Sequence, residues 1–176
     1  MAISPFVLHV AQIRRAAGTR NQVSCRGPID DLVCVGSSVP PGEDVVVDVT
    51  LESVMSGDAV AISAFGTVSA PWIGECRRCL EPISGVLNAR VRELYGEHGD
   101  SEEIYPLVGD LLDLEPLARD AMLLELPAAP VCRQDCHGIC VTCGTNRNEE
   151  TCDCSPQLDD RWAALDILRN SEGQVG

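Results

Sequence analysis

Apolar and polar residues alternate along three stretches in the first half of the chain, and each stretch predicts a β-strand. In residues 45–55 the odd positions up to Leu51 are apolar, whereas the even positions from 48 to 52 are polar. A period of two residues is typical of a strand with one buried and one exposed face. Residues 59–70 and 86–95 are the second and third stretches. We expect the three strands to form an antiparallel meander.

Turn-forming residues delimit these strands, and weaker patterns add two short ones. Residues 40–42 are Pro-Pro-Gly and precede the first strand, and residues 56–58, Ser-Gly-Asp, suit a hairpin turn to the second. We expect the second strand to bend at Gly66. The partial alternation of residues 6–13 predicts a further strand, and so does the run at 104–108. The pattern therefore predicts a meander or barrel-like sheet.

A helical period follows in residues 113–126. Asp113 is suited to cap this helix, and Glu115 and Pro116 are both favourable in a first turn. Pro127 ends the helix. The apolar positions of the predicted buried stripe are Leu114, Leu117, Ala121 and Leu124.

The last third of the chain differs from the rest in composition. Residues 131–154 are rich in cysteine, and a last helix is expected after a cap at Ser155 or Asp159. The apolar face of that helix would carry Trp162, Leu165 and Leu168. We therefore predict an α+β fold in two parts, with a β-rich body in residues 1–130 and a cysteine-rich tail with a terminal helix in residues 131–176.

The charge balance is strongly acidic. The chain has 27 acidic residues and 13 basic ones, all arginine, which gives a net charge of −14. Residues 97–126 hold nine of the acids and one arginine. This charge repels a phosphate backbone, so a basic protein is a better partner for the surface than naked RNA. The alternative is that the acidity only keeps the protein in solution.

The apolar runs and the cysteines bear on the compartment. The longest apolar runs are far too short to span a bilayer, and residues 1–10 lack the basic start and long apolar stretch of a secretory signal. We therefore expect a cytoplasmic protein. Ten cysteines in a reducing compartment indicate metal binding or redox chemistry rather than structural disulfides.

Six cysteines lie within 23 residues near the end of the chain and predict a zinc site. Zinc prefers four tetrahedral ligands, and thiolates suit it. The run from Cys140 to Gly144 has the form of a zinc knuckle, in which Gly144 allows the backbone to turn back toward the sulfurs. The six residues are Cys132, Cys136, Cys140, Cys143, Cys152 and Cys154.

An earlier pair, Cys76 and Cys79, falls at the turn between the second and third predicted strands. This pair could meet Cys132 and Cys136, which would leave the last four cysteines for a second four-thiolate site. One zinc site with spare thiols is the competing interpretation. His137 is a further candidate ligand, although a histidine there can equally be a surface residue.

The tail needs a metal on energetic grounds. Residues 131–154 contain few large apolar side chains, and ordering a residue costs about 1–2 kcal/mol. A structural zinc contributes roughly 10–16 kcal/mol in small modules. The site is therefore expected to be structural. A Cys-x-x-Cys redox dithiol is the alternative, but residues 80–85 are poor helix formers, unlike the segment that follows a thioredoxin-like motif.

Catalytic motifs are absent from the sequence. It contains no phosphate-binding glycine loop, nucleophile elbow or zinc-protease helix motif, so we expect neither an enzyme nor a small-molecule substrate. Candidate RNA or partner contacts are two arginine pairs. The competing interpretation is that these arginines only balance nearby acids. These pairs are Arg77 with Arg78 and Arg90 with Arg92.

Several segments, in order, resemble the YceD-like proteins. Residues 74–82, GECRRCLEP, resemble the central signature of that family, and residues 113–117 and 124–127 resemble its next block. The cysteines of 132–154, followed by DRWAAL at 160–165, are similar to the tail of many members. The resemblance implies a role in synthesis, processing or stability of the large-subunit (23S) ribosomal RNA, and it implies no catalytic mechanism.

Together these observations favour a non-enzymatic ribosome-biogenesis factor with one or two structural zinc ions. We expect it to act on the pre-ribosomal large subunit through a basic ribosomal protein, with limited RNA contact. Two alternatives remain: a zinc-supported interaction module with another partner, and a thiol redox or metal-sensing protein.

Overall fold

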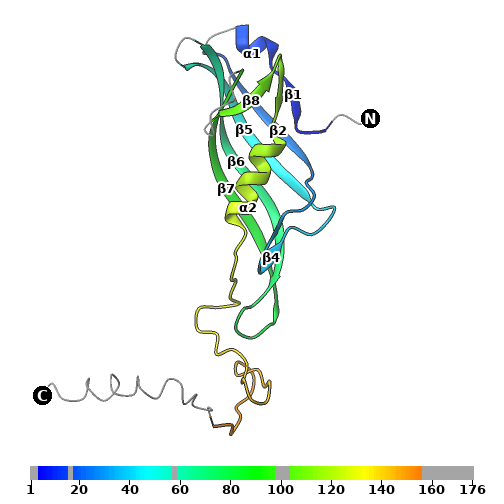
Figure 1. The fold of residues 1–176 in the computed structure, drawn as a ribbon, viewed down its shortest axis with the longest axis vertical. Helices are drawn as coiled ribbons and strands as arrows, with labels where there is room; N and C mark the ends of the chain where they lie inside the picture. The colour runs from blue at the N-terminus through cyan, green and yellow to red at the C-terminus, as the bar shows by residue number, and fades with distance from the viewer. Residues whose placement is uncertain (1–3, 16–17, 57–58, 98–103, 156–176) are drawn as a thin grey trace, which may run out of the picture.

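The core of the molecule is one large mixed β-sheet, seen in the computed structural model (Figure 1). The model describes residues 4–15, 18–56, 59–97 and 104–155. Three long strands dominate the sheet: β5 (Asp44–Ser56), β6 (Ala59–Glu75) and β7 (Pro82–Gly96). They pair in antiparallel order, as the meander predicted from the sequence requires, which confirms that prediction.

The alternation in β5 produces the two faces of the sheet. Val45, Val47, Val49 and Leu51 are each at most 1% exposed, whereas Asp48 between them faces solvent. Each buried aliphatic side chain stabilises the fold by roughly 1.5–3 kcal/mol relative to an exposed one. This row therefore fixes which face of the sheet packs on the core.

Shorter strands extend the sheet on both sides. β2 (Arg20–Pro28) pairs with the outer edge of β5, and the hairpin of β3 (Val33–Cys34) and β4 (Ser37–Ser38) pairs with β6 beyond the end of β5. On the other side, β8 (Ile104–Val108) runs parallel to β7, as a short strand that the sequence also predicted. β9 (Leu111–Asp113) and β1 (Val7–His9) complete that side. Within the described ranges no pairing joins β1 to β2, so the sheet is not closed.

Gly66 lies where two strands approach closely. It pairs with Val49 of β5, and a Cβ built on it would be 2.1 Å from the carbonyl oxygen of Asp48. No larger residue fits without displacing backbone, which is why this interior strand position is glycine.

Helix α2 (Glu115–Glu125) packs against β6 and β7 (Figure 1). Its buried stripe passes through Leu114, Ala118 and Met122, which are four residues apart. Leu124, which the sequence pattern assigned to the stripe, is 87% exposed, so that assignment was wrong. The N-cap residue is Leu114, while the Asp113 carboxylate accepts a hydrogen bond from the backbone N–H of Glu115 at 3.0 Å.

The N-terminal segment corrects another expectation. Strand β1 ends at His9, and helix α1 (Ala11–Arg15) replaces the rest of the strand predicted for residues 6–13. Val10 and Ile13 are both buried, and their spacing of three residues suits a helix rather than a strand. The expected hairpin turn at 56–58 and the last helix with Trp162, Leu165 and Leu168 fall wholly or partly outside the described residues.

Neither helix of the described ranges combines the length and apolar character that a bilayer crossing requires.

Helix α2 offers a matched test of the packing. Leu117→Ala removes a side chain that is 1% exposed and is expected to lower the free energy of unfolding by about 2–5 kcal/mol, because it leaves a cavity. Leu124→Ala is the same substitution at an exposed position of the same helix and should change it by less than about 0.5 kcal/mol. Urea denaturation followed by circular dichroism measures both. Equal losses would contradict the packing of α2 described above.

Candidate metal centre

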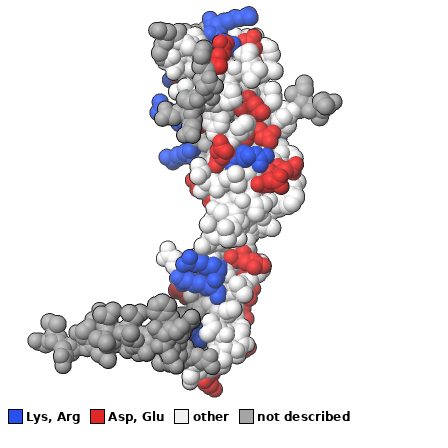
Figure 2. All heavy atoms as spheres, viewed as in Figure 1, with Lys and Arg blue, Asp and Glu red and all other residues white. Residues whose placement is uncertain are grey.

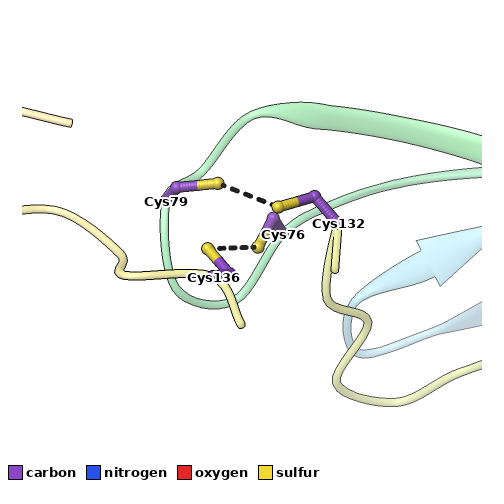
Figure 3. A group of neighbouring side chains, drawn as sticks. All are labelled: Cys76, Cys79, Cys132 and Cys136. Atoms are coloured by element: carbon purple, nitrogen blue, oxygen red, sulfur yellow. Dashed lines mark hydrogen bonds between the residues drawn. The ribbon is translucent and has the colours of Figure 1, made fainter. Parts of the chain in front are cut away.

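Four cysteines from distant parts of the chain meet at the end of the β6–β7 hairpin (Figure 3). Cys76 and Cys79 come from the turn between the two strands, and Cys132 and Cys136 come from the tail that follows α2. Their four Sγ atoms all lie within 4.8 Å of one another. We call these four residues the first cysteine group.

The distances within the first group fit a tetrahedral metal site. The Sγ atoms of Cys76 and Cys136 are 3.8 Å apart, and those of Cys79 and Cys132 are 3.6 Å apart. A Zn–S bond of about 2.3 Å gives a sulfur–sulfur edge of about 3.8 Å in a regular tetrahedron. These separations are far longer than a disulfide bond, and all four cysteines are free.

The hairpin turn is shaped to present its two thiols together. The backbone N–H of Leu80 donates to the carbonyl of Cys76, and the N–H of Cys76 donates to the carbonyl of Glu81, both at 2.8 Å. Leu80 has a φ of 63°, in the left-handed region that side chains other than glycine rarely adopt. This tight turn brings the sulfurs of positions 76 and 79 to the same side.

Backbone hydrogen bonds tie the tail to this turn. The N–H of Arg77 donates to the carbonyl of Pro130 at 2.9 Å, and the N–H of Ile139 donates to the carbonyl of Arg78 at 2.9 Å. The Arg78 guanidinium also donates to the carbonyl of Cys136 at 3.1 Å. The tail therefore contacts the hairpin on both sides of the segment that holds Cys132 and Cys136.

The pKa values of the first group reflect closely packed thiols. Burial acts to raise the pKa of Cys76, but hydrogen bonds from the backbone N–H groups of Cys132 and Cys79 outweigh it and lower the pKa to about 6. Burial and the neighbouring Cys136 raise the pKa of Cys132 to about 12. Four thiols this close cannot all lose their protons without a counter-ion, because the resulting like charges repel. A divalent cation would remove that repulsion.

A second cysteine group lies in the tail itself. Cys140, Cys143, Cys152 and Cys154 also have all their Sγ atoms within 4.8 Å of one another. The N–H of Gly144 donates to the carbonyl of Cys140, and the N–H of Cys140 donates to the carbonyl of Thr145, both at 2.8 Å. Gly144 has a φ of 77°, which allows this knuckle to turn back, as the sequence suggested.

The second group is also electrostatically prepared for a cation. Backbone N–H groups of Cys143 and Thr142 lower the pKa of Cys140 to about 5. The side-chain hydroxyl of Thr145, 3.2 Å from the Cys143 sulfur, lowers the pKa of that thiol. The neighbouring Cys143 and burial raise the pKa of Cys154 to about 12. Eight cysteines thus form two sets of four sulfur donors that could each hold a metal ion.

Other residues singled out by the sequence lie outside these sets. His137 is exposed and belongs to neither group; only its backbone N–H reaches the neighbouring loop, donating to the Oδ1 of Asn148 at 2.9 Å. Cys25 is buried in β2 and Cys34 is half-buried in β3, and neither belongs to the two groups.

The two arginine pairs do not form one patch. Arg77 and Arg78 are exposed at the hairpin turn, whereas Arg90 and Arg92 are exposed within β7. Eight residues of extended strand, about 27 Å, separate Arg90 from the start of β7. Figure 2 shows basic side chains in separate clusters, one over the sheet and one over the part of the molecule that holds both cysteine groups, which we call the cysteine module. The two pairs therefore lie at separate places along the β6–β7 hairpin.

Comparisons with known proteins identify a family and several relatives. Residues 64–169, which include both cysteine groups, match the family model of the large ribosomal RNA subunit accumulation protein YceD. An uncharacterized protein of Mycobacterium tuberculosis is 33% identical over 172 residues, covering 92% of this chain and 80% of that protein. A Mycobacterium leprae protein is 30% identical over 173 residues, covering 93% and 77%.

A plant relative carries a descriptive name. The large ribosomal RNA subunit accumulation protein YCED homolog 1, chloroplastic, of Arabidopsis thaliana is 34% identical over 64 residues, covering 36% of this chain and 20% of that protein. No solved structure matches the chain.

The first group can be tested by metal content. Cys136→Ser removes one of four sulfur donors and is expected to lower the metal bound to the purified, reduced chain by one ion. Cys25→Ser changes a buried cysteine outside both groups and should leave the metal content unchanged. Elemental analysis of matched preparations measures both. The same metal content in Cys136→Ser and the unmodified chain would contradict a site at the hairpin turn.

Proposed function

The chain belongs to the YceD family of large ribosomal RNA subunit accumulation proteins, and from this membership we propose that it is a non-enzymatic factor in the synthesis, processing or stability of 23S ribosomal RNA. The observation that carries the proposal is the family match over residues 64–169, which spans the hairpin, α2 and both cysteine groups. Ribosome assembly takes place in the cytoplasm, and we expect the protein there.

Zinc is the metal ion that we propose for both cysteine groups. Four thiolates with no open position are the donor set of structural zinc sites, whereas a catalytic zinc keeps a site for water or substrate. Among the described residues, the buried cluster at this end of the molecule consists of Cys76, Cys79 and Cys136, with Ile83 and Ile139 packed against it. Because so little apolar surface is buried there, metal–sulfur bonds would be the largest stabilising contribution.

A basic ribosomal protein is the proposed direct partner. Asp120, Leu124 and Glu125 are exposed on α2, at the side of the helix that lies beside β7. Acidic residues around an exposed apolar side chain complement a basic protein surface, and the net charge of −14 favours the same approach. Limited RNA contact through the exposed arginines at 77, 78, 90 and 92 is compatible with this arrangement.

A second apolar surface supports protein rather than RNA contact. A groove of about 970 Å³ lies between the β3–β4 hairpin, the end of β6 and residues 128–130. Val35 and Leu80 line it and are 97% and 57% exposed. Figure 2 shows an uncharged band between the sheet and the cysteine module. Contiguous exposed apolar surface is typical of protein interaction sites.

The family role can be tested by depletion and complementation. Loss of the protein is expected to lower the ratio of 23S to 16S ribosomal RNA, measured on total RNA. The unmodified chain and Cys25→Ser should restore the ratio, whereas Cys76→Ser combined with Cys79→Ser should not, because the module would lose its first metal. An unchanged ratio after depletion would contradict the proposed function.

The partner surface can be tested by co-sedimentation with ribosomal particles. Leu124→Ser combined with Glu125→Arg is expected to weaken binding to large-subunit precursors, because it removes the apolar contact and reverses a charge. Glu43→Arg places the same charge reversal in an exposed turn before β5 and should bind normally. Nuclease treatment of the particles before capture distinguishes direct contact with a ribosomal protein from direct contact with RNA. Complete loss of ribosomal proteins after nuclease would argue for RNA as the direct partner.

A further inference from the structure

Asn148 belongs to the loop of the second cysteine group, but its side chain lies against the first. Its Nδ2 donates to the Sγ of Cys136 at 3.3 Å. Its Oδ1 accepts from the backbone N–H of His137 at 2.9 Å and from the Arg133 guanidinium at 2.8 Å. One amide thus contacts a sulfur of the first group and the chain on both sides of that sulfur.

Asn146 orients this amide. Its Oδ1 accepts from the backbone N–H of Asn148 at 3.1 Å and from the Nδ2 of Asn148 at 2.8 Å. Its own Nδ2 donates to the Glu81 carboxylate at 3.3 Å, on the hairpin that carries Cys76 and Cys79. The loop of the second group therefore contacts both halves of the first.

Backbone contacts fix the position of one cysteine group relative to the other. Ile139 and Asn146 form an antiparallel bridge, and the N–H of Arg147 donates to the carbonyl of Gly138 at 2.8 Å. A Cβ on Gly138 would lie 2.9 Å from the carbonyl oxygen of Arg78, so this strand-like contact is closely packed against the hairpin. Residues 136–140 are thus enclosed between the hairpin and the loop.

The loop is itself closed by the second group. Asn146, Arg147 and Asn148 lie in the segment between Cys143 and Cys152, whose ends would be fixed by the second metal ion. Fixing both ends reduces the conformational entropy of that segment. A cation in the second group would therefore order the amide that hydrogen-bonds to the first, and the reverse also holds.

On this basis we propose that Asn148 is a positioning residue shared by both centres, and that the two metal ions bind interdependently, each raising the affinity for the other. The proposal rests on the metal binding proposed above. Loss of an outer partner of a metal ligand typically costs about 10–100-fold in affinity, which sets the scale of the expected coupling. By linkage, the factor is the same in both directions.

Cobalt(II) titration of the full-length, reduced chain measures this coupling. The sulfur-to-cobalt absorption reports thiolate ligation directly, in competition with a chelator of known affinity. Cys152→Ser with Cys154→Ser leaves only the first group, and Cys76→Ser with Cys79→Ser leaves only the second. The coupling factor is a ratio of association constants. Its numerator is the product of the two stepwise constants of the unmodified chain, and its denominator is the product of the constants of the two single-centre variants.

We expect a factor of about 10–100 in the unmodified chain, falling toward one in Asn148→Ala. Asn88→Ala, the same substitution at an exposed position of β7, should keep the full factor. Asn148→Asp keeps the acceptor oxygen and replaces the amide donor with a carboxylate oxygen, so it should weaken the first centre at least as much as alanine. Far-UV circular dichroism verifies that the sheet is intact in each variant.

Two results would overturn the proposal. The first is a factor within about two of unity in the unmodified chain, which would mean that two metals bind independently. The second is an unchanged factor in Asn148→Ala. Both leave the proposed metal sites standing, whereas a chain that binds no cobalt or zinc would contradict the metal sites themselves.

Discussion

The contact between the β6–β7 turn and the tail depends on sulfur. Elsewhere in the molecule a continuous apolar core joins the sheet to its helices. At the hairpin turn, by contrast, thiols themselves make up most of the buried cluster. Backbone hydrogen bonds such as Arg77 to Pro130 add direction, but each contributes only about 0.5–1.5 kcal/mol net. Cysteine side chains therefore make the main buried contact between the hairpin turn and the tail.

The sheet is built to carry this turn away from the body. Pairing between β5 and β6 ends at Val46 and Ser69, whereas pairing between β6 and β7 continues to Glu75 and Pro82. The short β4 strand pairs with the extension of β6 that β5 leaves free. The two cysteines of the hairpin consequently lie at the end of the paired extension of β6 and β7 (Figure 1). Helix α2 and the cysteine groups are thus held by the same two strands, β6 and β7.

Much of this structure follows from the sequence, for reasons that particular residues make clear. Strict alternation identified β5, and the spacing of the cysteines suggested the two sets of four that the fold brings together. β2 was missed because, as an edge strand, it buries only Cys25 and Gly27, and most of its other residues are polar. Leu124 was misassigned because it lies at the margin of the helix face that Leu114, Ala118 and Met122 define. The hydrogen bond from Asn148 to Cys136 has no sequence signal, since it is a tertiary contact.

The two sulfur sets differ in how far along the chain their members are separated. Cys79 and Cys132 are 53 positions apart, with β7, β8, β9 and α2 between them. The other set lies within residues 140–154 and encloses only short loops. Loop-closure entropy rises with the length of the enclosed chain, so the distant set gains its geometry from the folded sheet, whereas the local set needs only its own turn. The distant set therefore requires the folded sheet, whereas residues 140–154 are sufficient to assemble the local set.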